Sequence, residues 1–148
     1  MGKIIFIFAV SIFLFFGYFV LYKQPQRLAQ TNAMIGDKRI YVETADNSLK
    51  ITKGLSGREK LDGNNGMLFI FPSAHRPKFW MMGMNFGLDF IWINNGKVVD
   101  IHENITPENL SPPSTISPKD DVDMVLEVNS GFIKNNKIII GDNFQLLD

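Results

Sequence analysis

The sequence predicts a mainly β domain of the β-rich α+β type, a small closed or partly closed barrel with short helices. One N-terminal transmembrane helix is predicted to precede this domain. Three observations indicate this fold: an uncharged apolar run near the N-terminus, a succession of short β-rich segments after it, and no long segment of helical periodicity. The chain has 148 residues, which is enough for one domain and too few for two ordinary ones.

The apolar run extends over residues 4–22 and lies between Lys3 and Lys23. As a helix it would rise roughly 28 Å, close to the ~30 Å thickness of the hydrocarbon core of a bilayer. A cleaved signal peptide is the alternative, but residues 19–22 are bulky where cleavage requires small residues. We therefore predict a signal anchor at 1–23 and a polar linker at 24–36. The flanking lysines do not decide its orientation.

A single β-rich domain is predicted over 37–148. Its strands are marked by short runs of β-branched and aromatic residues, at 39–43, 49–52, 67–71, 79–84, 88–93, 98–101, 124–128 and 137–140. The clearest pair is a hairpin in which Asn94-Asn95-Gly96 joins 90–93 to 97–99, because Asn-Gly tolerates the positive φ of a tight turn. Strands that are apolar on both faces need cover on both sides, which a small barrel with short helices provides.

The predicted helices are short. Ser56 and Glu59 have the spacing of a capping box, which predicts a helix ending near Leu61. Thr106 before a proline predicts a further helical turn. The proline-rich stretch at 111–118 is predicted to be a surface loop, since proline cannot donate to a strand ladder.

The composition excludes several functions. The 15 basic and 15 acidic side chains cancel, and residues 31–148 carry a charge of about −3 without a basic cluster, so nucleic acid is not expected as a partner. The chain has no cysteine, which excludes disulfides, thiolate metal sites and thiol nucleophiles. Two histidines are too few for a three-histidine zinc site. We expect no cofactor and no metal.

Several short motifs follow one another through the domain. They are Gly54-Leu55-Ser56-Gly57-Arg58, Gly66-Met67-Leu68-Phe69-Ile70-Phe71, Phe79-Trp80-Met81, Leu88-Asp89, Val125-Leu126-Glu127-Val128-Asn129-Ser130-Gly131 and Gly141-Asp142. In this order and spacing they resemble the domain of unknown function 192 family, over about residues 49–148. The resemblance implies a compact β domain behind a signal peptide or single membrane segment, which favours an extracytoplasmic location, and it implies no activity. Met82 stands where the family often has lysine, and Gly87 where it often has proline.

Four residues are candidates for a pocket at the rim of the barrel, namely Arg58, Trp80, Asp89 and Glu127. Asp89 follows an apolar residue at the mouth of a strand, and Arg58 is its natural partner. The two either form a bidentate pair that ties the short helix to the rim or line a pocket for a polar ligand. Trp80 offers a flat apolar face, although most of the aromatic residues around it are expected in the core. Glu127 is compatible with a solvent-facing strand position.

The sequence favours a noncatalytic, membrane-anchored module that binds a small ligand, an envelope polymer or a protein partner. The alternative is an envelope hydrolase in which Asp89 works with Glu127 or His75 as acid and base. A third interpretation is a purely structural module for partner assembly. A Cu(I) site at Met81, Met82 and Met84 with the nearby His75 is less favoured, because the adjacent residues Met81 and Met82 would point to opposite faces of a strand.

Overall fold

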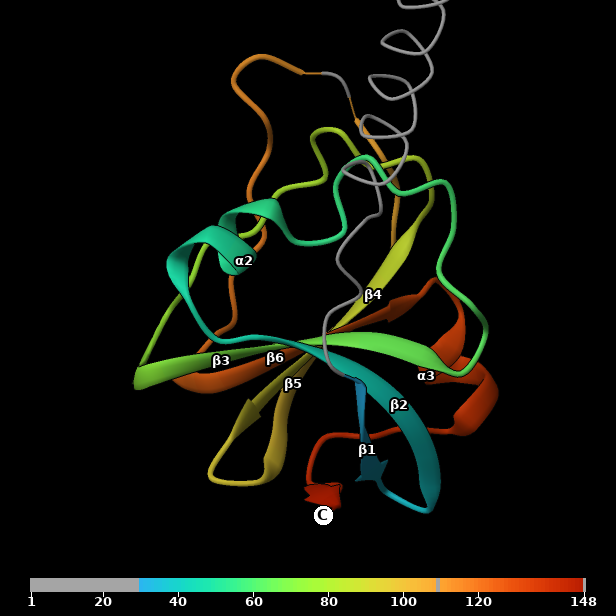
Figure 1. The fold of residues 1–148 in the computed structure, drawn as a ribbon. Helices are drawn as coiled ribbons and strands as arrows, with labels where there is room; N and C mark the ends of the chain where they lie inside the picture. The colour runs from blue at the N-terminus through green and yellow to red at the C-terminus, as the bar shows by residue number, and fades with distance from the viewer. Residues whose placement is uncertain (1–29, 109, 148) are drawn as a thin grey trace, which may run out of the picture.

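The computed structural model describes residues 30–108 and 110–147 (Figure 1). The predicted anchor at 4–22 lies outside these described residues. Within them, no helix is both long enough and apolar enough to cross a membrane.

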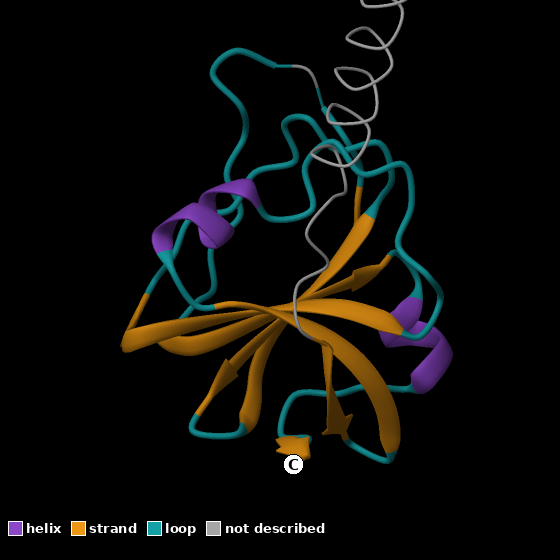
Figure 2. Cartoon of the chain, viewed as in Figure 1, coloured by secondary structure: helices purple, strands orange, loops and turns teal. Residues whose placement is uncertain are grey.

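The domain is mainly β, a seven-stranded sheet curled into a half-barrel with two short helices in the described part (Figure 2). In chain order the elements are β1 (Gln30–Ile35), β2 (Lys38–Ala45), α2 (Ser48–Lys53), β3 (Asn65–His75), β4 (Leu88–Asn94), β5 (Lys97–Ile105), β6 (Val122–Asn129), α3 (Phe132–Asn136) and β7 (Phe144–Leu147). The strands lie side by side in the order β5-β4-β6-β3-β2-β1-β7. Neighbouring strands are antiparallel except β2 and β3, which are parallel.

Backbone hydrogen bonds connect β5, at one end of this strand order, to the segment that leads into β7 at the other end. Val98 at the start of β5 donates to the carbonyl oxygen of Asp142 at 2.9 Å and accepts from the amide of Gly141 at 2.8 Å. Curling therefore satisfies backbone groups that a flat sheet would leave open at its edges.

Apolar side chains cover both faces of the sheet, as predicted from strands without a polar face. The first core, which we call the α3 core, packs Ile91, Leu126 and Val128 against Phe132 and Ile133 of α3. The second core, the α2 core, lies on the opposite face. It contains Met67, Phe69, Phe90, Trp92 and Val125, with Ile51 of α2 and residues from the loops packed against it. Figure 2 shows the two helices on different sides of the curled sheet.

The predicted hairpin is confirmed. Asn94 of β4 pairs with Lys97 of β5, and Asn95 and Gly96 turn the chain with φ values of 49° and 70°. These two positive φ values are the reason for Asn-Gly at this point, since other residues are strained there. The strands predicted at 39–43, 67–71, 88–93, 98–101 and 124–128 lie within β2, β3, β4, β5 and β6. Residues 111–118 form a loop as predicted, with one isolated bridge at Ile116.

Three predicted strands are wrong. Residues 49–52 belong to α2, which begins after Asn47, whose side chain accepts from the amide of Lys50 at 3.1 Å. That cap outweighs the β propensity of Ile51 and Thr52. Residues 79–84 form an irregular segment in which Phe79 makes an isolated bridge. Residues 137–140 follow α3, and Lys137 caps the C-terminus of that helix in a left-handed conformation.

The two predicted helices are also absent from the structure. The Ser56 hydroxyl donates to the carbonyl oxygen of Met82 at 3.4 Å rather than capping a helix, and residues 58–61 are irregular. Thr106 and Pro107 are likewise irregular.

The sheet starts earlier than expected. β1 lies at Gln30–Ile35, inside the range predicted as linker, and pairs with both β2 and β7. Neither β1 nor β7 has a run of β-branched residues that would have predicted it.

Candidate functional site

One row of residues crosses four strands on the face of the α2 core. Glu43 of β2 lies opposite Met67 of β3, Met67 opposite Glu127 of β6, and Glu127 opposite Phe90 of β4. Directly paired residues share a face of a sheet, so the two glutamates point to the same side, two strands or roughly 10 Å apart. Gly66 precedes Met67 and allows β6 to approach closely, because a Cβ there would lie 2.9 Å from the carbonyl oxygen of Glu127.

Arg58 binds the outer glutamate of this row. Its two terminal nitrogens donate to the Glu43 carboxylate at 2.8 and 2.6 Å, a bidentate ion pair. This hydrogen bonding raises the pKa of Arg58, with a smaller contribution from the charge of Glu127. The pair ties the loop after α2 to β2.

Glu127 lies buried, with 5% of its surface exposed, contrary to the solvent-facing position that the sequence allowed. No hydrogen bond reaches its carboxyl group from the described residues, because Arg58 is directed to Glu43. Burial disfavours the charged form and raises the pKa of Glu127 to about 8, a rise that the nearby Arg58 charge reduces. Near neutral pH the group is therefore mainly a carboxylic acid that can donate one hydrogen bond.

A cavity of about 380 Å³ opens above Glu127. Its walls are α2, the turn after it, the end of β3 and the segment that follows β3. The lining residues are Ile51, Thr52, Lys53, Gly54, Leu55, Ser56, Phe69, Phe71, His75, Arg76, Pro77, Lys78, Phe79, Trp80, Met84 and Glu127. Most of these side chains are apolar or aromatic, and Glu127 is the one acid among them.

Aromatic contacts hold the cavity walls in place. Phe79 meets Phe69 edge to face with ring centroids 4.9 Å apart, and it meets Phe90 and Trp92 at 5.7 and 5.6 Å. Phe90 and Trp92 are fully buried, as predicted for most of the aromatic residues, whereas Trp80 lines the cavity with 41% of its surface exposed. Trp80 is thus the one tryptophan that a bound molecule would contact.

Asp89 is not part of this site, which corrects the predicted Arg58–Asp89 pair. Asp89 lies opposite Val128, one residue away from the row of Glu127, so its side chain enters the α3 core on the other face. There it is fully buried and accepts from the amides of Asn104 at 2.8 Å and Ile133 at 2.9 Å. Its role is to satisfy a free N–H in the first turn of α3 and to hold β5 in place.

The methionines considered for copper do not converge. Met81 is buried in the α2 core, Met82 is 49% exposed, and Met84 lines the cavity. The His75 ring packs against Phe71 with a centroid distance of 4.7 Å. Among the described residues, no group of three or more His, Cys, Asp or Glu side chains is placed to hold a metal ion.

Sequence reasoning placed Trp80 and Glu127 in a common pocket, and both line the cavity. It missed Glu43, although the alternation of Ile40 and Val42 with Arg39, Tyr41 and Glu43 could have shown that Glu43 lies on the face opposite the α3 core. It also missed Lys53 and Lys78, which line the cavity and for which the sequence has no local signal.

The fold and the cavity define a small half-barrel β domain with a lined cavity beside α2. The chain belongs to the domain of unknown function 192 family, described as "Uncharacterized ACR", whose model matches residues 29–146. This confirms the resemblance seen in the sequence. A comparison with curated proteins finds no match.

Two solved structures are similar to this chain. A protein from Sinorhizobium meliloti 1021, described as a "putative transcription regulator", is 26% identical with a TM-score of 0.77, and the match covers 83% of this chain and 98% of that one. A protein of unknown function from Novosphingobium aromaticivorans DSM 12444 is 25% identical with a TM-score of 0.74, and the match covers 82% of this chain and 89% of that one.

Replacing Asp89 by alanine should destabilise the fold without affecting the cavity. The amides of Asn104 and Ile133 lose their acceptor, which should lower the free energy of unfolding by about 3 kcal/mol or more. Urea denaturation of the full chain measures this change. Asp62→Ala, at an exposed site, is the control and should stay within about 0.5 kcal/mol of the wild type. Equal stability of Asp89→Ala and the wild type would contradict the role given to Asp89.

Glu127 should make stability fall as the pH rises. Between its ordinary pKa of 4.5 and the folded value of about 8, the unfolded chain loses the proton while the folded chain keeps it. Between pH 5 and pH 8, the free energy of unfolding of the wild type should therefore fall by up to a few kcal/mol relative to that of Glu127→Gln. Thermal or urea unfolding across this range measures it, with the exposed Glu59→Gln as control. A constant difference across the range would show that Glu127 is not held as an acid.

Proposed function

We propose that this domain is a noncatalytic binding module that takes a small, largely apolar ligand into the cavity beside α2. The observation that carries the proposal is the Glu127 carboxyl group, which lines the cavity and has no hydrogen-bond partner among the described residues, so that its oxygens are open to the cavity rather than sealed in the core. A buried polar group is costly unless it is hydrogen-bonded, and a ligand in this cavity would supply the missing partner.

The dimensions and chemistry of the cavity support this proposal. Its volume of about 380 Å³ falls within the range of ~300–1,000 Å³ typical of small-molecule sites. Such sites combine apolar walls with a few polar groups that orient the ligand. Here Phe69, Phe71 and Trp80 form the walls, and Glu127 is the orienting group.

The hydrolase alternative loses its proposed acid and base pair. Asp89 is on the opposite face of the sheet from Glu127, and both of its carboxylate oxygens accept backbone N–H groups. It therefore cannot work together with Glu127 or with His75 in one cleft. We therefore propose that Glu127 forms a hydrogen bond with the ligand and does not act as a catalytic acid or base.

The description of the Sinorhizobium protein does not lead us to propose DNA binding. Residues 31–148 carry about −3 in charge, whereas contacts with phosphates need clustered lysine and arginine. A regulatory role for that protein would be compatible with ligand binding, and ligand binding is the part that this chain's cavity supports.

We further propose that residues 4–22 anchor the domain to a membrane, with the domain on the extracytoplasmic side. The support is the length and apolarity of this segment together with the family resemblance.

A tryptophan placed in the mouth should block binding. Thr52 lines the cavity from α2 and is exposed, so Thr52→Trp should fill the mouth and leave the core intact. Leu49→Trp is the matched control, on the same helix but 85% exposed and away from the cavity. The probe is naphthalene-2-sulfonamide, an uncharged aromatic molecule, added to the full-length chain in neutral detergent micelles. We expect the probe to bind Thr52→Trp at least about tenfold more weakly than the wild type, and to bind Leu49→Trp as tightly as the wild type.

The measurement is the shift of the Trp80 indole N–H signal in nuclear magnetic resonance spectra, with the buried Trp92 signal reporting that each variant is folded. A probe that does not saturate in the wild type, or that binds Thr52→Trp and Leu49→Trp equally, would contradict the proposed site.

Protease digestion of spheroplasts, in which the inner membrane is intact and accessible, tests the proposed location. An anchored extracytoplasmic domain should stay with the membrane fraction after alkaline extraction and should be digested without lysis of the inner membrane. Removal of residues 1–23 should release the domain from the membrane. Protection of the domain in spheroplasts whose inner membrane is intact would place it in the cytoplasm, and a freely soluble full-length chain would contradict the anchor.

A further inference from the structure

We infer that the ligand is an aromatic organic anion, whose ring lies between the aromatic walls and whose anionic group lies at the mouth beside Lys53 and Lys78. This inference rests on the binding function proposed above and adds the chemical class of the ligand.

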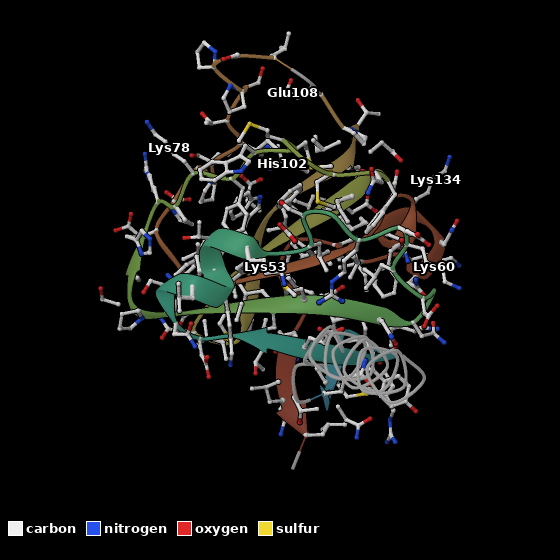
Figure 3. The ribbon with its side chains drawn as sticks, turned by 45° about the horizontal axis from the view of Figure 1, so that its top comes forward. Lys53, Lys60, Lys78, His102, Glu108 and Lys134 are labelled. Carbon is white, nitrogen blue, oxygen red and sulfur yellow. The ribbon has the colours of Figure 1, made fainter. Side chains whose placement is uncertain are left out.

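The charges of the cavity are separated between its mouth and its floor. Lys53 comes from the end of α2, and Arg76 and Lys78 come from the segment after β3. Figure 3 shows Lys53 beside α2 and Lys78 extending away from the ribbon. The single acid of the lining, Glu127, is buried on the sheet below them.

The two lysines at the mouth are available for a ligand. Arg76 lies 3.7 Å from Asp120 and 3.8 Å from Asp121, so neighbouring carboxylates already offset its charge. Lys53 and Lys78 form no ion pair with any residue of the described ranges 30–108 and 110–147. Two unpaired cations flanking one apolar recess favour an anionic group at that position.

The walls and the floor define the rest of the ligand. Phe69, Phe71 and Phe79 surround the interior with aromatic rings, which favour a flat ring over a flexible chain. Glu127 is mainly protonated near neutral pH, because burial raises its pKa, and it therefore offers a hydrogen-bond donor and no negative charge. A cationic ligand would meet repulsion at the mouth and gain no ion pair at the floor. The molecule that fits has an acceptor at its inner end, a ring in the middle and an anion at its outer end.

Two isosteric probes isolate the charge. Naphthalene-2-sulfonate and naphthalene-2-sulfonamide share a ring and a tetrahedral sulfur group, and they differ in one negative charge. We expect the sulfonate to bind the wild-type chain about threefold to tenfold more tightly at low salt, as two partly exposed ionic contacts allow. The preference should shrink as salt screens the charges. The Trp80 indole signal of the full-length chain again measures binding.

Matched double variants locate the effect. Lys53→Gln with Lys78→Gln should abolish the preference for the sulfonate and leave the affinity for the sulfonamide unchanged. Lys60→Gln with Lys134→Gln removes the same amount of charge from lysines that do not line the cavity and lie toward the other side of the view in Figure 3. This control should keep the preference.

Each remaining outcome has a defined meaning. A preference that survives in the Lys53 and Lys78 variant, or that falls equally in both double variants, overturns the inference of a local anion site. Octanoate binding more tightly than the sulfonate overturns the preference for a ring. Equal binding of both naphthalene probes to the wild type overturns the anionic class while leaving the binding function in place. Failure of both probes to bind overturns the binding function as well.

Discussion

The register of β6 between β3 and β4 is the constraint on which the site depends. Because side chains alternate along a strand, Glu127 faces the α2 core and its neighbour Val128 faces the α3 core, together with Asp89 opposite it. A slip of one residue would exchange these faces, moving a carboxyl group into the α3 core and an apolar side chain to the cavity. Gly66 supports this register, since its missing Cβ leaves room for the β6 backbone. The chemistry of the cavity thus follows from strand pairing.

The two buried acids show opposite solutions to the cost of burying a carboxyl group. Asp89 accepts two backbone N–H groups, so its oxygens are satisfied by the protein. Glu127 has no such donors, and the nearest cation, Arg58, is held by Glu43 at 2.6 and 2.8 Å. Glu127 therefore avoids the cost by keeping its proton, which leaves a polar group directed at an apolar space. The first arrangement stabilises the fold, whereas the second preserves a capacity for hydrogen bonding.

Local patterns predicted the centre of the sheet better than its edges or its cover. The strands β3, β4 and β6 contain the apolar runs 67–71, 90–93 and 124–126, and the Asn95-Gly96 turn has its own backbone requirement, so the sequence predicts both. The short polar strand β1 forms through its partners on either side, and α2 forms through the Asn47 cap despite β-branched residues. The Arg58–Glu43 pair depends on the parallel pairing of β2 with β3, a long-range contact that no local pattern indicates.

The two faces of the sheet differ in what covers them, and this difference explains why the cavity beside α2 opens on the face of the α2 core. On the α3 face, Phe132 and Ile133 of α3 pack into the core, and backbone hydrogen bonds connect 141–142 to β5. On the α2 face, the cover is a six-residue helix and the irregular segments at 54–61 and 76–87, which cannot follow the sheet surface closely. The space left between them is lined by Phe69 of β3 and Glu127 of β6. A cover made of loops and a short helix can also change its side chains, and therefore its ligand, without disturbing the strands beneath it.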